Sequence, residues 1–207
     1  KDARKKVLGV WQKLLGLRAD WEALNDGSRQ LATSLVNNML EMEQLSVKNC
    51  WIKLTAEGSF PDLHERLEAR MWEKVYKSSH ALEKAVNGLG GIVVSMRILL
   101  AEMDDLVCEG LKPRPQKPSD NEGEGPTPLF LVSSIAVLAE IMRELVDMYN
   151  KELELKAAMA QDMPNNFNRT ALTAYLSVWT IQIHLDEDRI KQIDKQIEAE
   201  SVLAPPP

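Results

Sequence analysis

Apolar residues repeat along the first quarter of the chain with the spacing of a coiled-coil helix. One heptad register runs from residue 7 to residue 52, with Val7, Leu14, Trp21, Leu35 and Met42 in one column and Val10, Leu17, Leu24, Leu31, Leu45 and Ile52 in the other. Only Ser28, Asn38 and Asn49 interrupt it. The pattern predicts one continuous helix about 70 Å long.

Two polar stretches are candidate helix boundaries. Asn25–Ser28 contains Asp-Gly, a turn dipeptide, and Ser28 is able to cap a new helix. Because the heptad register carries through these residues, we expect the helix to continue. Gly58–Pro61 is a stronger boundary, since Pro61 suits a first helical turn and Ser59 or a neighbour suits the cap, so a second long helix is expected to start there.

The second long helix is expected to end near Gly110. Its stripe alternates steps of three and four residues through Leu82, Ala85, Leu89, Ile92, Met96, Leu99, Met103 and Leu106. Gly88–Gly91 lies within this stripe but lacks the Lys and Ser or Thr of a P-loop, and no strand precedes it. A kink or a close helix contact is the favoured interpretation.

The remaining third of the chain predicts a linker, two shorter helices and a tail. Residues 112–128 hold five prolines and no apolar period, which is typical of a flexible linker. Leu138, Ile141, Leu145, Met148, Leu155 and Met159 mark a third helix, ended by Pro164–Asn166. Asn168 or Thr170 can cap a fourth, with its stripe at Leu172, Leu176, Trp179, Ile183, Ile190, Ile193 and Ile197.

These elements together predict an all-α fold, an elongated antiparallel four-helix bundle or coiled coil of two long and two shorter helices. Along the chain we expect a long helical hairpin over 1–110, a Pro/Gly/acidic linker over 111–128, a second hairpin over 129–203 packed on the first, and a proline tail over 204–207. Leu, Met and Ala dominate the apolar residues, whereas Phe and Tyr total only six, which also favours helix over sheet.

Charge and cysteine content narrow the functional classes. The 207 residues carry a net charge of −6, which disfavours direct binding to nucleic acid, and the basic residues at positions 1, 4, 5 and 6 are expected to be a solvated helix start. Two cysteines, Cys50 and Cys108, provide neither a disulfide framework nor a thiolate zinc site, so we expect a reducing compartment. No run of about 18 consecutive apolar residues is present, so no membrane association is expected.

The sequence contains no recognisable catalytic apparatus. His184 and Asp188 have the i, i+4 spacing of two metal ligands on one helix, but with no further ligand nearby we expect a solvated polar face. There is no Gly-x-Ser-x-Gly motif or reactive cysteine setting, so we expect no enzyme, cofactor or metal. Of the five tryptophans, Trp21 and Trp179 are expected in the core; for Trp11, Trp51 and Trp72, core packing and partner contact stay equally open.

Four stretches, in order and at matching distances, resemble the cyclin-dependent kinase 2-interacting protein family. They are Trp11 with Trp21–Asp26, Thr127–Phe130, Leu145–Lys156, and the Tyr-Leu-Ser-x-Trp run at Tyr175–Trp179 within residues 172–179. The match covers mostly 11–36 and 127–190, about half of the chain. Residues 37–110 match only as generic helix, and Phe60–Leu63 looks more like another small helical subunit reported to share an ATPase assembly with this family.

The resemblance implies a nuclear adaptor, with the cytoplasm as a second compartment, that binds a cyclin-dependent kinase and checkpoint or replication proteins. It also implies that the adaptor joins a AAA ATPase complex acting in replication and ribosome maturation, together with another small helical subunit. The residues it suggests for fold or partner contacts are Trp11, Trp21, Asn25, Asp26, Tyr149, Lys151, Glu152, Tyr175 and Trp179. A structural coiled-coil subunit of a cytoskeletal or tethering assembly is the alternative, and a small helical metal-dependent hydrolase is a third hypothesis.

Overall fold

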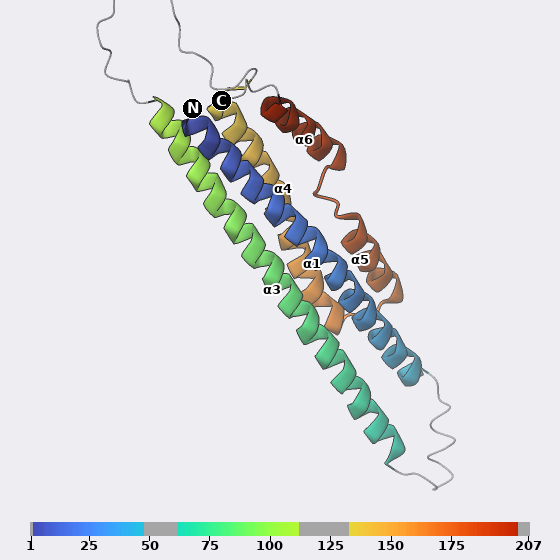
Figure 1. The fold of residues 1–207 in the computed structure, drawn as a ribbon. Coiled ribbons are helices and arrows are strands. Elements are labelled where there is room, and N and C mark those ends of the chain that lie inside the picture. Colours follow the sequence, from blue (N-terminus) through green and yellow to red (C-terminus); the bar gives the residue numbers. More distant parts are fainter. Residues whose placement is uncertain (1, 48–61, 112–132, 203–207) are drawn as a thin grey trace, which may run out of the picture. The chain divides into compact units, whose positions relative to one another are not determined.

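The computed structural model describes residues 2–47, 62–111 and 133–202, which form helices and short connections (Figure 1). The α-helices there are α1 (Asp2–Val47), α3 (Leu63–Leu111), α4 (Ile135–Asp162), α5 (Arg169–Ile181) and α6 (Glu187–Val202), and the 3₁₀ helix η1 (Met163–Asn165) follows α4. No strand occurs in these ranges, so the prediction of an all-α fold is confirmed for them.

The structure bears out the continuity of the first predicted helix and the ends of the second and third. Helix α1 continues without interruption through Asn25–Ser28, which confirms the continuous helix. Helix α3 ends at Leu111, beside the predicted end at Gly110, and α4 ends at Asp162 just before Pro164. The predicted boundary at 58–61, the linker at 112–128, the tail at 204–207 and Trp51 lie outside the described residues.

The single fourth helix predicted from the stripe that includes Trp179, Ile183 and Ile190 is wrong. Two helices occupy this region, because α5 ends at Ile181 and Gln182 adopts the left-handed conformation at φ 53° and ψ 62°. Helix α6 then begins at Glu187, where Asp186 Oδ1 accepts a hydrogen bond from Arg189 N at 2.9 Å. His184 therefore lies in the connection, and no single helix face carries both His184 and Asp188.

The helices contribute to two compact units, neither of which is a continuous stretch of chain. Unit 1 comprises the described parts of Lys1–Asp20, Ile92–Lys151 and His184–Pro207, and unit 2 those of Trp21–Gly91 and Glu152–Ile183. Helices α1, α3 and α4 each supply residues to both units, whereas α6 belongs to unit 1 and α5 to unit 2.

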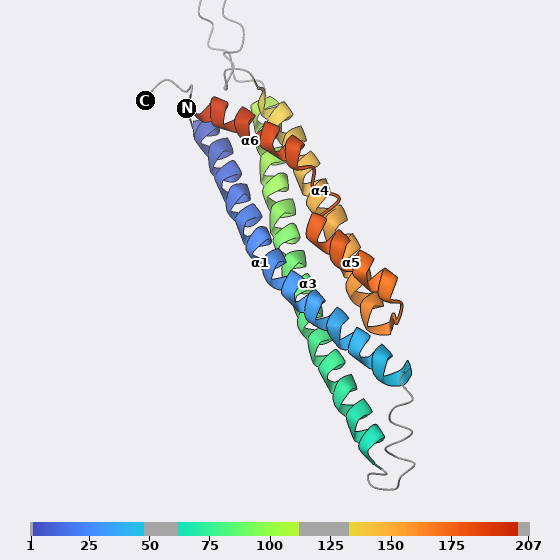
Figure 2. The ribbon, with the colours of Figure 1, turned by 90° about the vertical axis from the view of Figure 1, so that its right-hand side faces the viewer.

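Unit 1 has an apolar core, and α6 contacts its neighbours through both apolar and polar side chains. Residues of the core are Val7, Val10, Trp11, Leu14, Met96, Met103, Leu138, Met142, Leu145 and Tyr149. Helix α6 lies across α1 and α4 (Figure 2) and adds Ile193 to this core. Arg18 binds both carboxylate oxygens of Asp194, at 2.6 and 3.0 Å, and Arg189 binds both of Glu144, at 2.8 and 2.7 Å.

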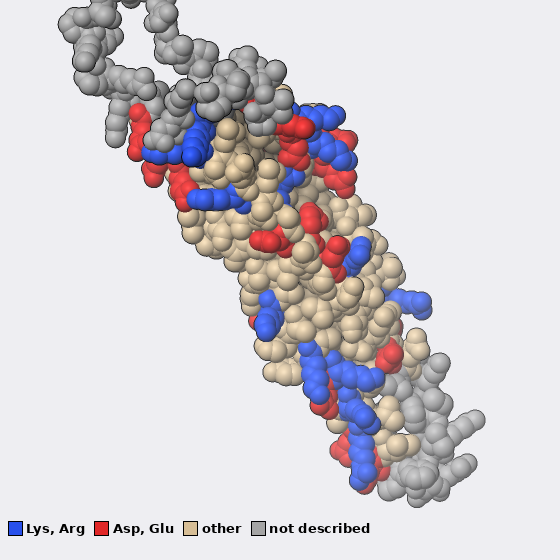
Figure 3. Space-filling model, viewed as in Figure 1, with Lys and Arg blue, Asp and Glu red and all other residues tan. Residues whose placement is uncertain are grey.

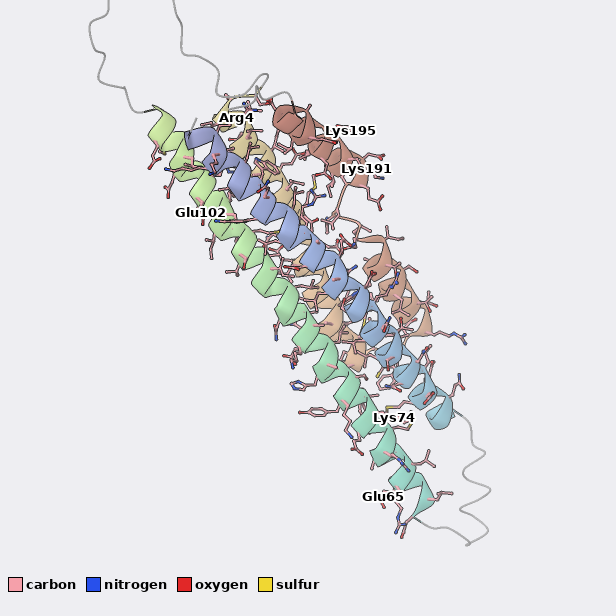
Figure 4. All side chains as sticks on the ribbon, viewed as in Figure 1. Arg4, Glu65, Lys74, Glu102, Lys191 and Lys195 are labelled. Carbon is pink, nitrogen blue, oxygen red and sulfur yellow. The ribbon has the colours of Figure 1, made fainter. Side chains whose placement is uncertain are left out.

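Unit 2 packs α5 against the antiparallel α1 and α3 and the end of α4. Its buried cluster contains Ala32, Leu35, Val36, Met39, Val75, Leu82, Val86, Met159, Met163, Leu172 and Trp179. Asn38 donates to Ser78 at 3.2 Å, and one turn further along Lys74, labelled in Figure 4, pairs with Glu41 at 3.7 Å.

Gly88 lets α1 and α3 approach each other closely in unit 2. A Cβ atom at residue 88 would lie 2.8 Å from Leu24 Cδ2, inside normal van der Waals contact. This confirms a close helix contact within the glycine-rich stretch Gly88–Gly91.

One described helix would be long and apolar enough to cross a membrane, judged by length and composition alone. It is the Glu65–Glu109 part of α3, whose best window has a mean hydropathy of 1.4 and is 33% buried. A core helix of a soluble protein passes the same test, so this finding alone is weak evidence for a span.

Candidate partner-binding surface

The start of α5 is fixed by a local network of polar side chains. Asn168 caps the helix, because its Oδ1 accepts from Thr170 N at 2.9 Å and from Ala171 N at 3.2 Å. Tyr175 Oη donates to Asp162 Oδ2 at 2.6 Å, and Asn166 Nδ2 donates to the same oxygen at 2.9 Å. The hydrogen bond from Tyr175, followed by that from Asn166, lowers the pKa of Asp162. The first turns of α5 are thereby tied to the end of α4.

The inner face of α5 is attached to α1 through a hydrogen-bonded tryptophan. Trp179 is fully buried, and its indole Nε1 donates to Ser28 Oγ at 3.0 Å. Ser28 Oγ in turn donates to the carbonyl oxygen of Asn25 at 2.8 Å. Ser28, which interrupts the heptad register of α1, is therefore the residue that accepts the hydrogen bond from the Trp179 indole of α5.

A buried cation attaches the same face of α5 to α4. Lys156 Nζ donates to the carbonyl oxygen of Trp179 at 2.9 Å, lies 3.2 Å from Glu152 Oε1, and lies 4.7 Å from the centroid of the Trp179 ring. Both charged side chains are fully buried. Burial lowers the pKa of the Lys156 ammonium from its usual 10.5, and the attraction of Glu152 opposes that shift.

The outer face of α5 is exposed and almost free of charge. Thr173, Ala174, Ser177 and Thr180 are exposed there, and Arg169 is the only charged residue of the helix. Thr173, Ser177 and Thr180 each donate their hydroxyl hydrogen to the carbonyl oxygen four residues earlier, at 2.8, 3.1 and 2.8 Å. Because the hydroxyl hydrogens are already bonded to the helix backbone, methyl groups and the Ala174 side chain remain for contact with another surface.

Two isoleucines are exposed to solvent at the end of α5, one in its last position and one in the turn that follows. Ile181 is 67% exposed and Ile183 is 55% exposed. Between them Gln182 caps the helix, its backbone N donating to the carbonyl oxygen of Val178 at 3.1 Å. The Gln182 side chain is clamped, since Oε1 accepts from Trp21 Nε1 at 2.9 Å and Nε2 donates to Glu22 Oε2 at 3.3 Å.

The backbone conformation at Gln182 costs free energy, and the turn nevertheless leaves Ile181 and Ile183 exposed on either side of it. A non-glycine residue in the left-handed region costs about 1–2 kcal/mol, and Gln182 is the only such residue in the described part of the chain. Exposed apolar side chains on a rigid support are typical of protein-binding surfaces. We name the exposed face of α5 together with Ile181 and Ile183 the α5 surface.

The residues that the family resemblance suggested differ in burial, since some lie in the core and others are partly or fully exposed. Six are buried: Trp11, Trp21, Asn25, Tyr149, Glu152 and Trp179. Asp26 and Lys151 are exposed and pair locally with Arg29 at 3.6 Å and with Asp147 at 2.7 Å, while Tyr175 is half-buried. Trp21, Asn25, Asp26, Glu152, Tyr175 and Trp179 belong to unit 2, in the elements that support α5.

The tryptophans follow the expectations where the structure describes them. Trp21 and Trp179 are in the core as predicted, and Trp11, whose role was left open, is also buried. Trp72 is 43% exposed and packs edge-on against Phe167, with ring centroids 6.4 Å apart.

Sequence reasoning missed Ile181, Gln182 and Ile183 as a surface, because it placed them within one long helix. One available signal was the acidic run Asp186–Asp188, since acidic residues favour a helix N-terminus. No group of three or more His, Cys, Asp or Glu residues suited to a metal ion occurs in the described ranges.

Fold and surface together define a class, an all-helical protein that presents a rigid, nearly uncharged helix face. No protein-family model matches the chain. The chain is 27% identical over 205 residues to the cyclin-dependent kinase 2-interacting protein of Bos taurus, covering 88% of this chain and 86% of that protein. The human protein of that name is 26% identical over 199 residues (89% and 87% covered), and the Mus musculus protein 24% identical over 202 residues (94% and 91% covered). The similarity runs along most of the chain and indicates a relationship to these proteins.

Proposed function

We propose that this chain is a non-enzymatic adaptor that binds a cyclin-dependent kinase through the α5 surface. The observation that carries the proposal is the similarity, over 88–94% of the chain, to three proteins named for their interaction with cyclin-dependent kinase 2. In this role the chain holds its partner by binding alone.

The rigidity of the α5 surface supports a binding role. Binding loses free energy whenever flexible side chains must be ordered, so a surface that is fixed beforehand binds more tightly for the same contact area. Helix α5 is fixed by its Asn168 cap, by the Trp179–Ser28 hydrogen bond and by the buried Lys156, and Gln182 fixes the turn. Ile181 and Ile183 then serve as apolar anchors at the C-terminal end of the surface.

The finer functional assignment rests on the family resemblance in the sequence. We propose that the protein acts in the nucleus, and also in the cytoplasm, with checkpoint or replication proteins among its partners. It would join a AAA ATPase complex in replication and ribosome maturation, beside another small helical subunit. Binding without turnover is proposed because the sequence offers no recognisable nucleophile and base arrangement.

Affinity purification from native cells tests the partner assignment. The tagged chain is purified and the proteins that accompany it in stoichiometric amount are identified by mass spectrometry. A cyclin-dependent kinase is the expected partner, and AAA ATPase subunits would support the finer proposal. Recovery of cytoskeletal or tethering proteins alone would contradict the adaptor and favour the structural coiled-coil alternative.

A further inference from the structure

A hollow between α1 and α3 in unit 1 is not part of the α5 surface. It has a volume of about 430 Å³ and is lined by Gly16, Leu17, Ser95, Ile98 and Leu99, with the charged Lys13 and Asp20 on α1. Ile98 is 57% exposed at this site. The surrounding α3 surface is mostly uncharged (Figure 3), since Arg97 is the only charged residue between positions 85 and 101 and it hydrogen-bonds to Asn150.

Among the described residues, none lies where a side chain at position 16 would begin. A Cβ atom built on Gly16 would meet no other atom within 4 Å, in contrast to Gly88, where Leu24 lies close. Glycine inside a helix is destabilising relative to alanine, and a common reason for its presence is the close approach of another backbone. Gly9, Gly27 and Gly91 are equally open, but among these four glycines Gly16 alone lines the hollow, where it leaves the α1 backbone accessible to a second copy.

The two charged residues at the hollow, Lys13 and Asp20, would face residues of opposite charge in a second copy of the chain related by a two-fold axis. Lys13 and Asp20 are seven residues apart, about two helical turns, so they lie on the same face of α1 with Gly16 and Leu17 midway between them. A two-fold axis perpendicular to α1 at this midpoint places Lys13 of one copy opposite Asp20 of the other, and Asp20 opposite Lys13. Asp20 makes no hydrogen bond or ion pair with another described residue, so its carboxylate is available.

Ile98 lies near the level of the same axis. Lys13 pairs with Glu102 at 3.3 Å, and Glu102 is labelled in Figure 4. Because α3 runs antiparallel to α1, the level of Gly16 and Leu17 corresponds to that of Ile98, which lines the same hollow. Two copies related by this axis therefore bring their exposed Ile98 side chains together above the Gly16 backbones.

We propose that unit 1 forms an antiparallel homodimer in which the hollows of two copies face each other across a two-fold axis near Gly16. The parts of α1 and α3 in unit 1 are each about 30 Å long, and two packed helices are about 20 Å wide. That face buries roughly 600 Å² per copy, or about 1,200 Å² in total, which is the lower limit for a specific interface. The dimer is consequently weak and depends on concentration.

Sedimentation velocity of the purified chain, from about 1 to about 100 µM, tests the dimer. The wild-type chain is expected to shift from monomer to dimer across this range. Gly16→Lys places a long cation at the axis and is expected to raise the dissociation constant at least about tenfold, while the monomer stays folded because Gly16 has open space. Gly27→Lys is the matched control, since Gly27 also lies in α1 with no atom near its Cβ position but belongs to unit 2.

Reversal of the two charges distinguishes the proposed geometry from other modes of association. Lys13→Glu and Asp20→Lys are each expected to weaken the dimer several-fold, and the double variant is expected to restore it, because a Glu at 13 then faces a Lys at 20. A wild-type chain that stays monomeric throughout the range would overturn the proposal. So would a dimer that is unaffected by Gly16→Lys, or one that the double charge reversal fails to rescue.

Discussion

Lys156 is a buried cation that contributes to the position of α5 more than to overall stability. Its ammonium bonds to the carbonyl oxygen of Trp179 and pairs with Glu152, and neither charged side chain reaches solvent. Taking two charges out of water costs about as much free energy as their attraction returns, so a buried pair is weakly stabilising at best. What the pair does provide is a link between helices, because Lys156 also donates to the carbonyl oxygen of Trp179 and so joins α4 to α5.

This interpretation predicts an asymmetry between single and double substitutions. Lys156→Met alone is expected to lower the free energy of unfolding by about 3 kcal/mol, because it removes the cation beside the buried Glu152 carboxylate. The double variant Lys156→Met with Glu152→Leu is expected to lie within about 1 kcal/mol of the wild type. Denaturant unfolding of the three proteins measures both values, and equal losses in the single and double variants would refute the interpretation.

At the residue scale, the sequence predicts the apolar core better than the polar contacts inside it. Trp21 and Trp179 were identified as core from their periodic positions. Ser28 and Asn38 were visible only as interruptions of the heptad register, and the structure shows that they hydrogen-bond to Trp179 and Ser78. Such partners come from distant parts of the chain, so helical periodicity carries no information on which residues they are.

At the element scale, the start of α5 depends on a single cap. Asn168→Ala removes the acceptor for two backbone N–H groups and is expected to destabilise the protein by about 1 kcal/mol. Asn168→Asp keeps an acceptor at that position and serves as the control. The measurement is again denaturant unfolding, and an Asn168→Ala protein as stable as the wild type would contradict the capping role.

An ion pair between Arg189 and Glu144 joins α6 to α4. Hydrogen bonding to Arg189 lowers the pKa of Glu144 below its usual 4.5. A carboxylate with a lowered pKa in the folded state contributes stability above the unfolded pKa, and this contribution is lost as the pH falls below 4.5 through the folded pKa. Since the two side chains are 35% and 39% exposed, solvent screens the pair and the contribution is small.

The pKa of Glu144 reports the contact with Arg189 more directly than the stability of the protein does. Arg189→Gln removes the guanidinium and is expected to raise the pKa of Glu144 toward 4.5, as followed by the NMR chemical shift of its carboxyl carbon. Lys191→Gln, which leaves Arg189 in place, is the control and is expected to have no effect. If Glu144 titrates at the same pH in the wild type and in Arg189→Gln, the contact is not formed in solution.

The division of the predicted fourth helix shows where periodicity misleads at the element scale. Trp179, Ile183 and Ile190 keep helical spacing, and no Gly or Pro marks a break between them. The helix ends because Gln182 adopts a left-handed conformation and its side chain bonds to Trp21 and Glu22 of α1. Tertiary contacts thus override the local pattern, and the exposed Ile181 and Ile183 are a consequence of that break.

At the scale of the whole molecule, composition and periodicity were sufficient for the all-α class and for the continuity of α1 through Asn25–Ser28. They could not reveal that each compact unit combines segments from both halves of the chain, since this depends on which helix faces meet. The α5 surface was equally hidden, because it is defined by exposed side chains beyond a helix end whose position depends on tertiary contacts.

The α5 surface gives the adaptor account a specific test by mutation. Ile181→Asp with Ile183→Asp is expected to weaken kinase binding at least about tenfold, because the two apolar anchors are replaced by solvated charges. Both side chains are exposed, so the helix content and the thermal midpoint should change little. Val137→Asp, an equivalent change at a residue of α4 that is 46% exposed in unit 1, is the matched control.

The most direct measurement is the binding of the purified chain to a purified cyclin-dependent kinase 2–cyclin complex, followed by biolayer interferometry for the wild type and these variants. The account predicts saturable binding by the wild type and by Val137→Asp, and its loss in the Ile181→Asp, Ile183→Asp protein. An absence of binding by the wild type would contradict the proposed function, and equal binding by all three would show that the kinase uses a different surface.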